Sequence, residues 1–188
     1  MSNQTSRGAA RWATLVAVPL ALLAGLAVFA GMGGFGRDAA TPEPTPTTTA
    51  PPATGPVQAT ATALTPRAAT VCRTLVSRLP GDLRGQARRP VTAGPQQNAA
   101  YGDPAITISC GGPPPAFAPT DLVYPLDHVC WHAAESTEAT IWTTVDRELP
   151  IRVRVPRIYG QPGQWVIVLS APVLATVPAI PKPPNGCG

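Results

Sequence analysis

The pattern of hydrophobic and polar positions predicts a helix at residues 67–79. Val71, Leu75 and Leu79 recur at i, i+4 and i+8, while arginines occupy the opposite side. This spacing is typical of an amphipathic helix that packs on a core through one face. A Thr-Pro pair directly before the segment and a Pro-Gly pair directly after it are signals for the start and the end of a helix.

Alternating patterns further along the chain predict β-strands. At residues 105–110 (AITISC) every second position is apolar, which indicates a strand with one buried face. Residues 137–145 and 150–155 are rich in β-branched side chains and are separated by a short polar stretch, so we expect an antiparallel hairpin. In its second half, aliphatic residues alternate with Arg152 and Arg154, which are therefore predicted to point outward.

The last elements of the chain are predicted to be a strand and a short helix. Residues 165–169 (WVIVL) suit a strand, and Ser170 would then cap a helix that runs through Thr176. The predicted fold class is therefore α+β, with a small antiparallel sheet packed against the helix at residues 67–79.

A long apolar run near the N-terminus predicts one transmembrane helix at residues 13–35. No charged residue occurs between Arg11 and Arg37. At about 1.5 Å per residue, a helix of about 20 residues crosses a hydrocarbon core about 30 Å thick. A cleaved signal peptide is the alternative, but the apolar region of such a peptide is as a rule only about 7–15 residues long.

The charges beside this segment predict its orientation. Arg7 and Arg11 precede the apolar run, whereas Arg37 on the other side is offset by Asp38. By the positive-inside rule, residues 1–12 form a cytoplasmic tail. The predicted localisation is the cell membrane, crossed once, with the C-terminal domain outside the cytoplasm.

Residues 36–66 are predicted to form a disordered linker that is rich in proline and threonine. The chain has 25 prolines among 188 residues, and many of them fall in this segment. Such a composition cannot bury enough apolar area to offset the entropy lost on ordering. We expect an extended spacer ahead of a domain at residues 67–188, although Thr-Pro tracts also resemble O-glycosylated stalks.

All four cysteines lie in the predicted C-terminal domain. An even number of cysteines outside the cytoplasm indicates two disulfides. Four cysteines allow three pairings, and spacing alone does not choose among them. We favour Cys72 with Cys110, which would tie the first helix to the first strand, and Cys130 with Cys187, which would hold the C-terminal tail.

The alternative for part of this set is a metal site at His128, Cys130 and His132. Structural zinc sites usually contain closely spaced pairs of ligands, and here the remaining ligands would have to come from distant positions. Two disulfides account for all four cysteines at once, so we expect no metal and no cofactor.

The charge of the chain argues against nucleic acid as a partner. Its formal net charge is +4, and only 13% of its residues are charged. A nucleic-acid-binding domain usually carries a concentrated basic stripe with aromatic residues. The nearest group here is Arg84, Arg88 and Arg89, which is short and has no aromatic neighbours in sequence.

Several short motifs are spread along residues 67–178. They are Cys72 with Leu75 and Leu79-Pro80, Arg88-Arg89, Tyr101-Gly102-Asp103-Pro104-Ala105-Ile106 and Cys110-Gly111, with weaker matches at Trp142, Val153, Val155-Pro156 and Tyr159. With these motifs, most of residues 67–178 resembles the actinobacterial membrane-protein family named domain of unknown function 3515. The resemblance implies an envelope location, but it supplies no activity. Cys130 and Cys187 look like additions to the family pattern, in agreement with their pairing, and Tyr101 stands where the family typically has tryptophan.

The sequence contains no recognisable catalytic motif, such as a nucleophile elbow, a zinc-protease helix or a phosphate-binding glycine loop. Asp103 is the best single polar candidate, although Asp before Pro with Gly beside it is typical of a turn. The candidate ligand contacts are Arg88, Arg89, Tyr101 and Asp103. We expect a noncatalytic domain that binds an envelope protein or a cell-wall component. The alternative is an envelope-acting enzyme that uses Asp103 or the pair His128 and His132.

Overall fold

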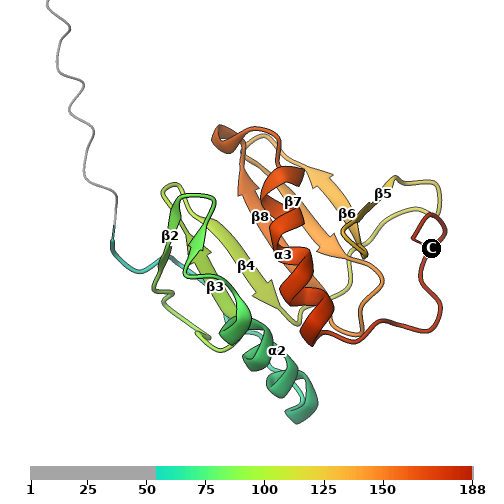
Figure 1. Cartoon of the computed structure of the whole chain (residues 1–188), viewed down its shortest axis with the longest axis horizontal. Helices are drawn as coiled ribbons and strands as arrows, with labels where there is room; N and C mark the ends of the chain where they lie inside the picture. The colour runs from blue at the N-terminus through green and yellow to red at the C-terminus, as the bar shows by residue number, and fades with distance from the viewer. Residues whose placement is uncertain (1–53, 188) are drawn as a thin grey trace, which may run out of the picture. The chain divides into compact units, whose positions relative to one another are not determined.

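The computed structural model describes residues 54–187, which form an antiparallel sheet with two long helices (Figure 1). The predicted transmembrane helix at residues 13–35 and most of the predicted linker lie outside the described residues. Within residues 54–187, no helix combines the length and the apolar character needed to cross a membrane.

The sheet has eight strands in the order β1-β2-β3-β4-β8-β7-β6-β5, and every neighbouring pair is antiparallel. It is larger than the small sheet that the sequence predicts. In chain order the elements are α2 (Pro66–Arg78), β1 (Asp82–Leu83), β2 (Gln86–Arg89), β3 (Asn98–Tyr101), β4 (Ile106–Cys110), β5 (Val123–Leu126), β6 (Val129–Glu135), β7 (Ala139–Thr144), β8 (Ile151–Pro156), a 3₁₀ turn η1 (Arg157–Tyr159) and α3 (Gly163–Thr176).

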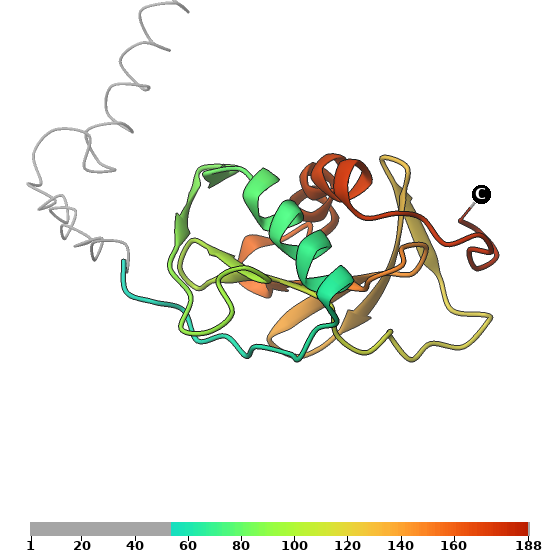
Figure 2. The same cartoon turned by 90° about the horizontal axis from the view of Figure 1, so that it is seen from below.

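Both helices lie on the same face of the sheet, as Figure 2 shows. We call this the covered face and the opposite one the open face. The hydrophobic core fills the space between the helices and the covered face, where Leu75 of α2 and Trp131 of β6 are fully buried. The α+β fold class is therefore confirmed.

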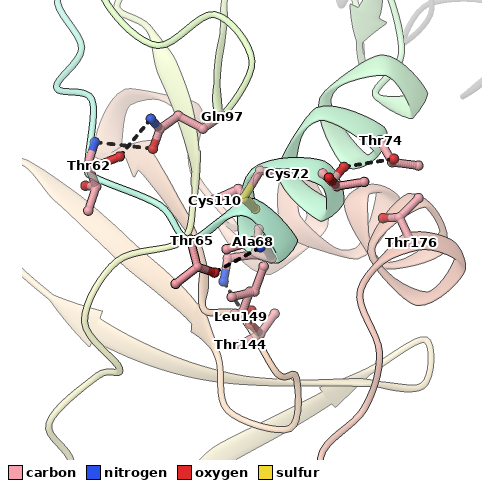
Figure 3. The surroundings of a disulfide bond; sticks show 12 residues. Thr62, Thr65, Ala68, Cys72, Thr74, Gln97, Cys110, Thr144, Leu149 and Thr176 are labelled. Atoms are coloured by element: carbon pink, nitrogen blue, oxygen red, sulfur yellow. Dashed lines mark hydrogen bonds between the residues drawn. A yellow bond between two sulfur atoms is a disulfide. The ribbon is translucent and has the colours of Figure 1, made fainter.

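The predicted first helix is confirmed as α2, and its ends have clear causes. The hydroxyl of Thr65 accepts a hydrogen bond from the N–H of Ala68 (3.3 Å), and Pro66 begins the first turn. The helix buries Cys72 and Leu75 toward the sheet. Cys72 forms a disulfide with Cys110 of β4, next to the capped end of the helix (Figure 3).

The predicted strands at residues 105–110, 137–145 and 150–155 are confirmed as β4, β7 and β8. The last two pair as the expected hairpin, with Trp142 opposite Val153. Sequence patterns did not reveal β1, β2 and β3, and they left β5 and β6 unassigned, because four of these five strands have only two to four residues.

The predicted strand at residues 165–169 is wrong, since this segment belongs to α3. Ser170 does not cap a helix but lies inside α3, fully buried, and accepts a hydrogen bond from Trp131 Nε1 at 3.3 Å. The buried residues of α3 are Val166, Leu169, Ser170 and Val173, which follow helical spacing. Packing on the covered face thus outweighs the preference of β-branched residues for strands.

Residues 54–65, which we call the strap, are fixed on the domain although they were predicted to end a disordered linker. Val57 forms a parallel bridge with Val91, and the Gln97 side chain bonds both the N–H and the carbonyl of Thr62. The strap passes on the side of the sheet away from the helices before it enters α2 (Figure 2). The ordered domain therefore begins earlier than the predicted boundary at residue 67.

The second predicted disulfide, Cys130–Cys187, is also present and joins β6 to the C-terminal tail. Cys130 is 1% exposed, whereas Cys187 is half-buried. The tail is further attached by the N–H of Ile180, which donates to Asp146 O at 2.9 Å. No cysteine among the described residues is free.

Candidate functional site

A row of five polar side chains crosses the open face of the sheet. Residues that stand directly opposite each other in neighbouring strands point to the same face. The strand register therefore aligns, from β3 to β6, Asn98, Ser109, Arg152, Thr143 and His132. Arg152 in the middle is exposed and Ser109 is half-buried, while Asn98, Thr143 and His132 are buried.

Two irregular segments bury the ends of this row and leave a groove between them. The strap covers the Asn98 end, where Asn98 Nδ2 donates to Thr60 O at 3.0 Å. The loop at residues 111–122 covers the His132 end, where the Phe117 ring stacks on the imidazole with centroids 5.0 Å apart. The groove has a volume of about 380 Å³ and is lined by Gln58, Ala59, Thr60, Thr62, Val91, Asn98, Ala99, Thr107, Ile108, Ser109, Gly111, Gly112, Pro113, Pro150 and Arg152.

Gly111 lies against the Leu64 side chain of the strap at one end of the groove. This glycine has a φ of +75°, and a Cβ atom there would meet Leu64 Cδ2 at 2.5 Å. Any side chain at this position would therefore be strained in its backbone conformation and would displace the Leu64 side chain of the strap. The glycine that follows the first predicted strand thus helps to shape the groove.

Arg152 differs from the other two arginines that the register places on the open face. Arg89 donates to Gly55 O and to Gly102 O, and Arg154 lies 3.3 Å from the Glu138 carboxylate. Arg152 has no hydrogen bond or ion pair with any residue that the structure describes. Its five N–H donors are therefore available to a ligand.

The hydroxyl groups of the groove are similarly unoccupied. Within residues 54–187, the side chains of Thr60, Thr62, Thr107 and Ser109 make no hydrogen bond. Each hydroxyl can donate one hydrogen bond and accept two. The groove thus combines one cationic donor with several groups that both donate and accept.

The candidate histidines do not form a site together. His128 is exposed in the tight turn between β5 and β6, with a φ of +62°, and so does not lie on the strand. His132 Nε2 lies 3.8 Å from Asp121 Oδ2 and under the Phe117 ring. Cys130 is engaged in its disulfide, and residues 54–187 contain no group of three His, Cys, Asp or Glu side chains placed to hold a metal ion.

Asp103 lies in the turn between β3 and β4, as its place between a glycine and a proline predicts. It precedes Pro104 through a cis peptide bond, and its carboxylate is 3.5 Å from Arg89. Tyr159 donates a hydrogen bond to Pro104 O at 2.7 Å, and burial raises the pKa of Tyr159, with the Asp103 charge adding to this rise. Since β4 and β6 are three strand spacings apart, or about 14 Å, Asp103 and His132 do not converge.

The remaining candidate contacts divide between the two faces. Tyr101 is fully buried on the covered face, donates to Pro80 O at 2.7 Å, and has a pKa raised by burial, which Arg88 partly offsets. Arg88 also points to this face and donates to Val76 O at 3.2 Å. Arg88 and Tyr101 are register partners on the covered face, whereas Arg89 points to the open face, so the structure divides the four candidates into two separate pairs, Arg88 with Tyr101 and Arg89 with Asp103.

The groove residues were not identified as a site from the sequence. The alternation in residues 150–155 does predict that Arg152 points outward, and this is the one signal that could have found it. The walls come from the strap and from the loop at residues 111–122, which have no hydrophobic periodicity. Their positions on the open face were therefore not predictable from pattern.

Comparison with known families confirms the resemblance seen in the sequence motifs. No curated protein and no solved structure matches the chain. A family model with the description "Protein of unknown function (DUF3515)" matches residues 16–182, and the chain belongs to this family.

Proposed function

We propose that this protein is a membrane-anchored, extracytoplasmic binding domain of the cell envelope, and that the groove on the open face is its binding site. The proposed domain is noncatalytic and holds an envelope component close to the membrane. One observation carries the proposal. Arg152 has no partner among residues 54–187 and lies at the floor of a groove walled by the strap and by the loop at residues 111–122.

A polar sheet face alone would not support a binding role, because antiparallel sheets commonly leave one face in water. Here the strap and the loop at residues 111–122 partly enclose the open face and leave a groove. Its volume of about 380 Å³ is within the range of small-molecule sites, about 300–1,000 Å³. The enclosure gives a ligand several walls to contact at once.

The composition of the groove supports binding rather than catalysis. General acid–base chemistry requires a side chain that exchanges a proton near the working pH, and nucleophilic chemistry requires an activated nucleophile. No Asp, Glu, His or Cys is among the described residues that line the groove. Asp103, His128 and His132, the residues of the alternative enzymatic hypothesis, all lie outside this lining.

The proposed location is supported by features outside the groove. Two disulfides are typical of domains in oxidising compartments. The apolar run at residues 13–35 has the length and the flanking charges of a membrane anchor. An alkaline phosphatase fused after Gly188 should therefore be active in intact cells, and an inactive but folded fusion would contradict this location.

Site-specific photo-crosslinking in intact cells tests the binding role. A photoreactive phenylalanine replaces either Thr107, which lines the groove, or Thr74, which is exposed on the outer side of α2. We expect adducts with envelope material from position 107 and few or none from position 74. Adducts from position 74 alone, or from neither position although the protein reaches the envelope, would overturn the proposal.

A further inference from the structure

We infer that the ligand of the groove is an anionic sugar, with its carboxylate or phosphate on Arg152 and its hydroxyl groups along the strap and β4. This inference rests on the proposed function and names the chemical class that the site would recognise. It follows from the charge, the hydrogen-bonding groups and the walls of the groove.

The charge of the groove selects an anion. Arg152 is the one charged residue among the described residues that line the groove, and no carboxylate there opposes it. The residues directly opposite it on the neighbouring strands are Ser109 and Thr143, which are neutral. An unpaired guanidinium offers a planar fork that matches carboxylate and phosphate oxygens, and such charge-assisted bonds are stronger than neutral ones.

The neutral part of the lining selects a hydroxylated ligand. Threonine and serine hydroxyls and the amide of Gln58 surround the floor, and each can donate or accept hydrogen bonds. The Asn98 amide nitrogen already donates to Thr60 O and Ala93 O. A sugar hydroxyl has the same dual capacity, so it can satisfy these groups without leaving one unpaired. The described lining includes no aromatic ring, which makes it a poor site for a nucleobase or an acyl chain.

The strap would be ordered further by such a ligand. Gln58, Ala59, Thr60 and Thr62 of the strap line one side of the groove, and Ser109 and Arg152 of the sheet line the floor. Some of the hydrogen bonds that hold the strap are exposed, among them the pair between Thr62 and Gln97. A ligand that bridges strap and sheet should therefore slow amide hydrogen exchange in the strap.

A titration of the full chain in non-ionic detergent tests the inference with three sugars. N-acetylmuramic acid carries a carboxylate, glucose 6-phosphate carries a phosphate, and N-acetylglucosamine is the neutral control. We expect at least one anionic sugar to shift the amide NMR signals of Ser109, Gly111 and Arg152 and to protect the strap from exchange. The neutral sugar should bind at least about tenfold more weakly, since hydrogen bonds to charged groups are the stronger ones.

Two variants on β8 distinguish recognition by the groove from a general effect of positive charge on affinity. Arg152→Gln should weaken binding of the anionic sugar by about tenfold or more. Arg154→Gln removes a positive charge from the same face, but Arg154 pairs with Glu138 and does not line the groove. It should leave the affinity within about twofold, because a screened surface charge contributes little.

The outcomes distinguish this inference from the proposed function. Tighter binding of the carboxylate sugar or of the phosphate sugar than of the neutral sugar would support the inference and would identify which anionic group the groove binds. Equal binding of the neutral sugar, or an unchanged affinity in Arg152→Gln, would overturn it. If none of the three sugars binds but position 107 still forms adducts in cells, the ligand class is wrong and the binding role stands. If the adducts are also missing, both are wrong.

Discussion

The covered and open faces of the sheet are built from the same strands but carry opposite kinds of side chain. On β8, Ile151 and Val153 are fully buried under the helices, while Arg152 between them is exposed on the other side. On β4, Ile108 is 2% exposed and its neighbour Ser109 is only half-buried. Successive side chains of one strand therefore point alternately into the core and toward the groove.

Because of this difference, stability and binding can be altered separately by substitutions at adjacent positions of one strand. Substitutions on the covered face remove apolar contacts and leave cavities. Substitution of Arg152, in the middle of the open face, changes a side chain that is exposed to water. The experiments below test this separation, beginning with the largest expected loss of stability.

Replacing Trp131 by alanine should have the largest effect. Trp131 is fully buried and donates to the equally buried Ser170. Its removal should lower the free energy of unfolding by about 3–5 kcal/mol, as for other buried aromatic residues. Urea denaturation of the full chain in detergent, followed by far-UV circular dichroism, measures this loss. Trp131→Phe keeps most of the volume and should cost clearly less, and equal losses would contradict the cavity explanation.

The two disulfides should differ in their contribution to stability, although their loops are similar. They span 38 and 57 residues, and the loop-entropy model gives about 4 kcal/mol for either. Loss of Cys72–Cys110 should reach this value, since both residues belong to the core on the covered face. Loss of Cys130–Cys187 should cost about half as much, because the tail beyond Ile180 can fray while the rest stays folded.

Double alanine variants of each pair, compared by the same denaturation assay, measure this difference. Hydrogen exchange adds a second reading, because fraying of the tail should raise the exchange rate only near residues 181–187. Equal losses of stability, or exchange that spreads through the sheet when Cys130–Cys187 is missing, would contradict this difference between the two disulfides.

Tyr101 should make the covered face sensitive to high pH. Burial raises the pKa of Tyr101 above its ordinary value of 10.0. Below that value the tyrosine is neutral in both the folded and the unfolded chain, so its contribution to stability is complete. As the pH rises above 10, the unfolded chain ionises first, and stability is lost until the folded pKa is passed.

The substitution Tyr101→Phe tests this explanation. It should cost about 1 kcal/mol at neutral pH, since the hydrogen bond to Pro80 O is lost, and it should reduce the fall in stability above pH 10. Tyr124→Phe is the control, because Tyr124 is 38% exposed. If Tyr124→Phe flattened the alkaline fall as much as Tyr101→Phe, burial of Tyr101 would not be its cause.

The covered face was largely predictable from the sequence, and the open face was not. The spacing of Val71, Leu75 and Leu79 and the alternation in β4 and β8 follow directly from burial on one side. In contrast, α3 contains no charged residue that would mark a solvent-exposed side. The helical periodicity of its apolar residues is therefore not visible in the sequence, and residues 165–169 resemble a strand.

The groove was not predictable because its parts have no common pattern. Its walls come from the strap and the loop at residues 111–122, whose prolines and glycines indicate only irregular chain. Within residues 54–187, Arg154 has a partner and Arg152 has none, because the folded chain places Glu138 beside Arg154. The candidate residues from the family motif, Tyr101 and Asp103, instead lie in a buried contact and in a turn.

The smallest change in stability is expected for Arg152→Gln, and its comparison with Val153→Ala is the sharpest test of the two faces. Val153→Ala should cost about 2 kcal/mol through lost burial and a cavity, because its side chain is fully enclosed. Arg152→Gln should change stability by less than about 0.5 kcal/mol, since an exposed side chain without partners contributes little to folding. In the sugar titration the two variants should show the opposite effect, with Arg152→Gln losing affinity and folded Val153→Ala retaining it.

A large loss of stability in Arg152→Gln would mean that the guanidinium supports the fold. Stability and binding would then not be separated between the two faces.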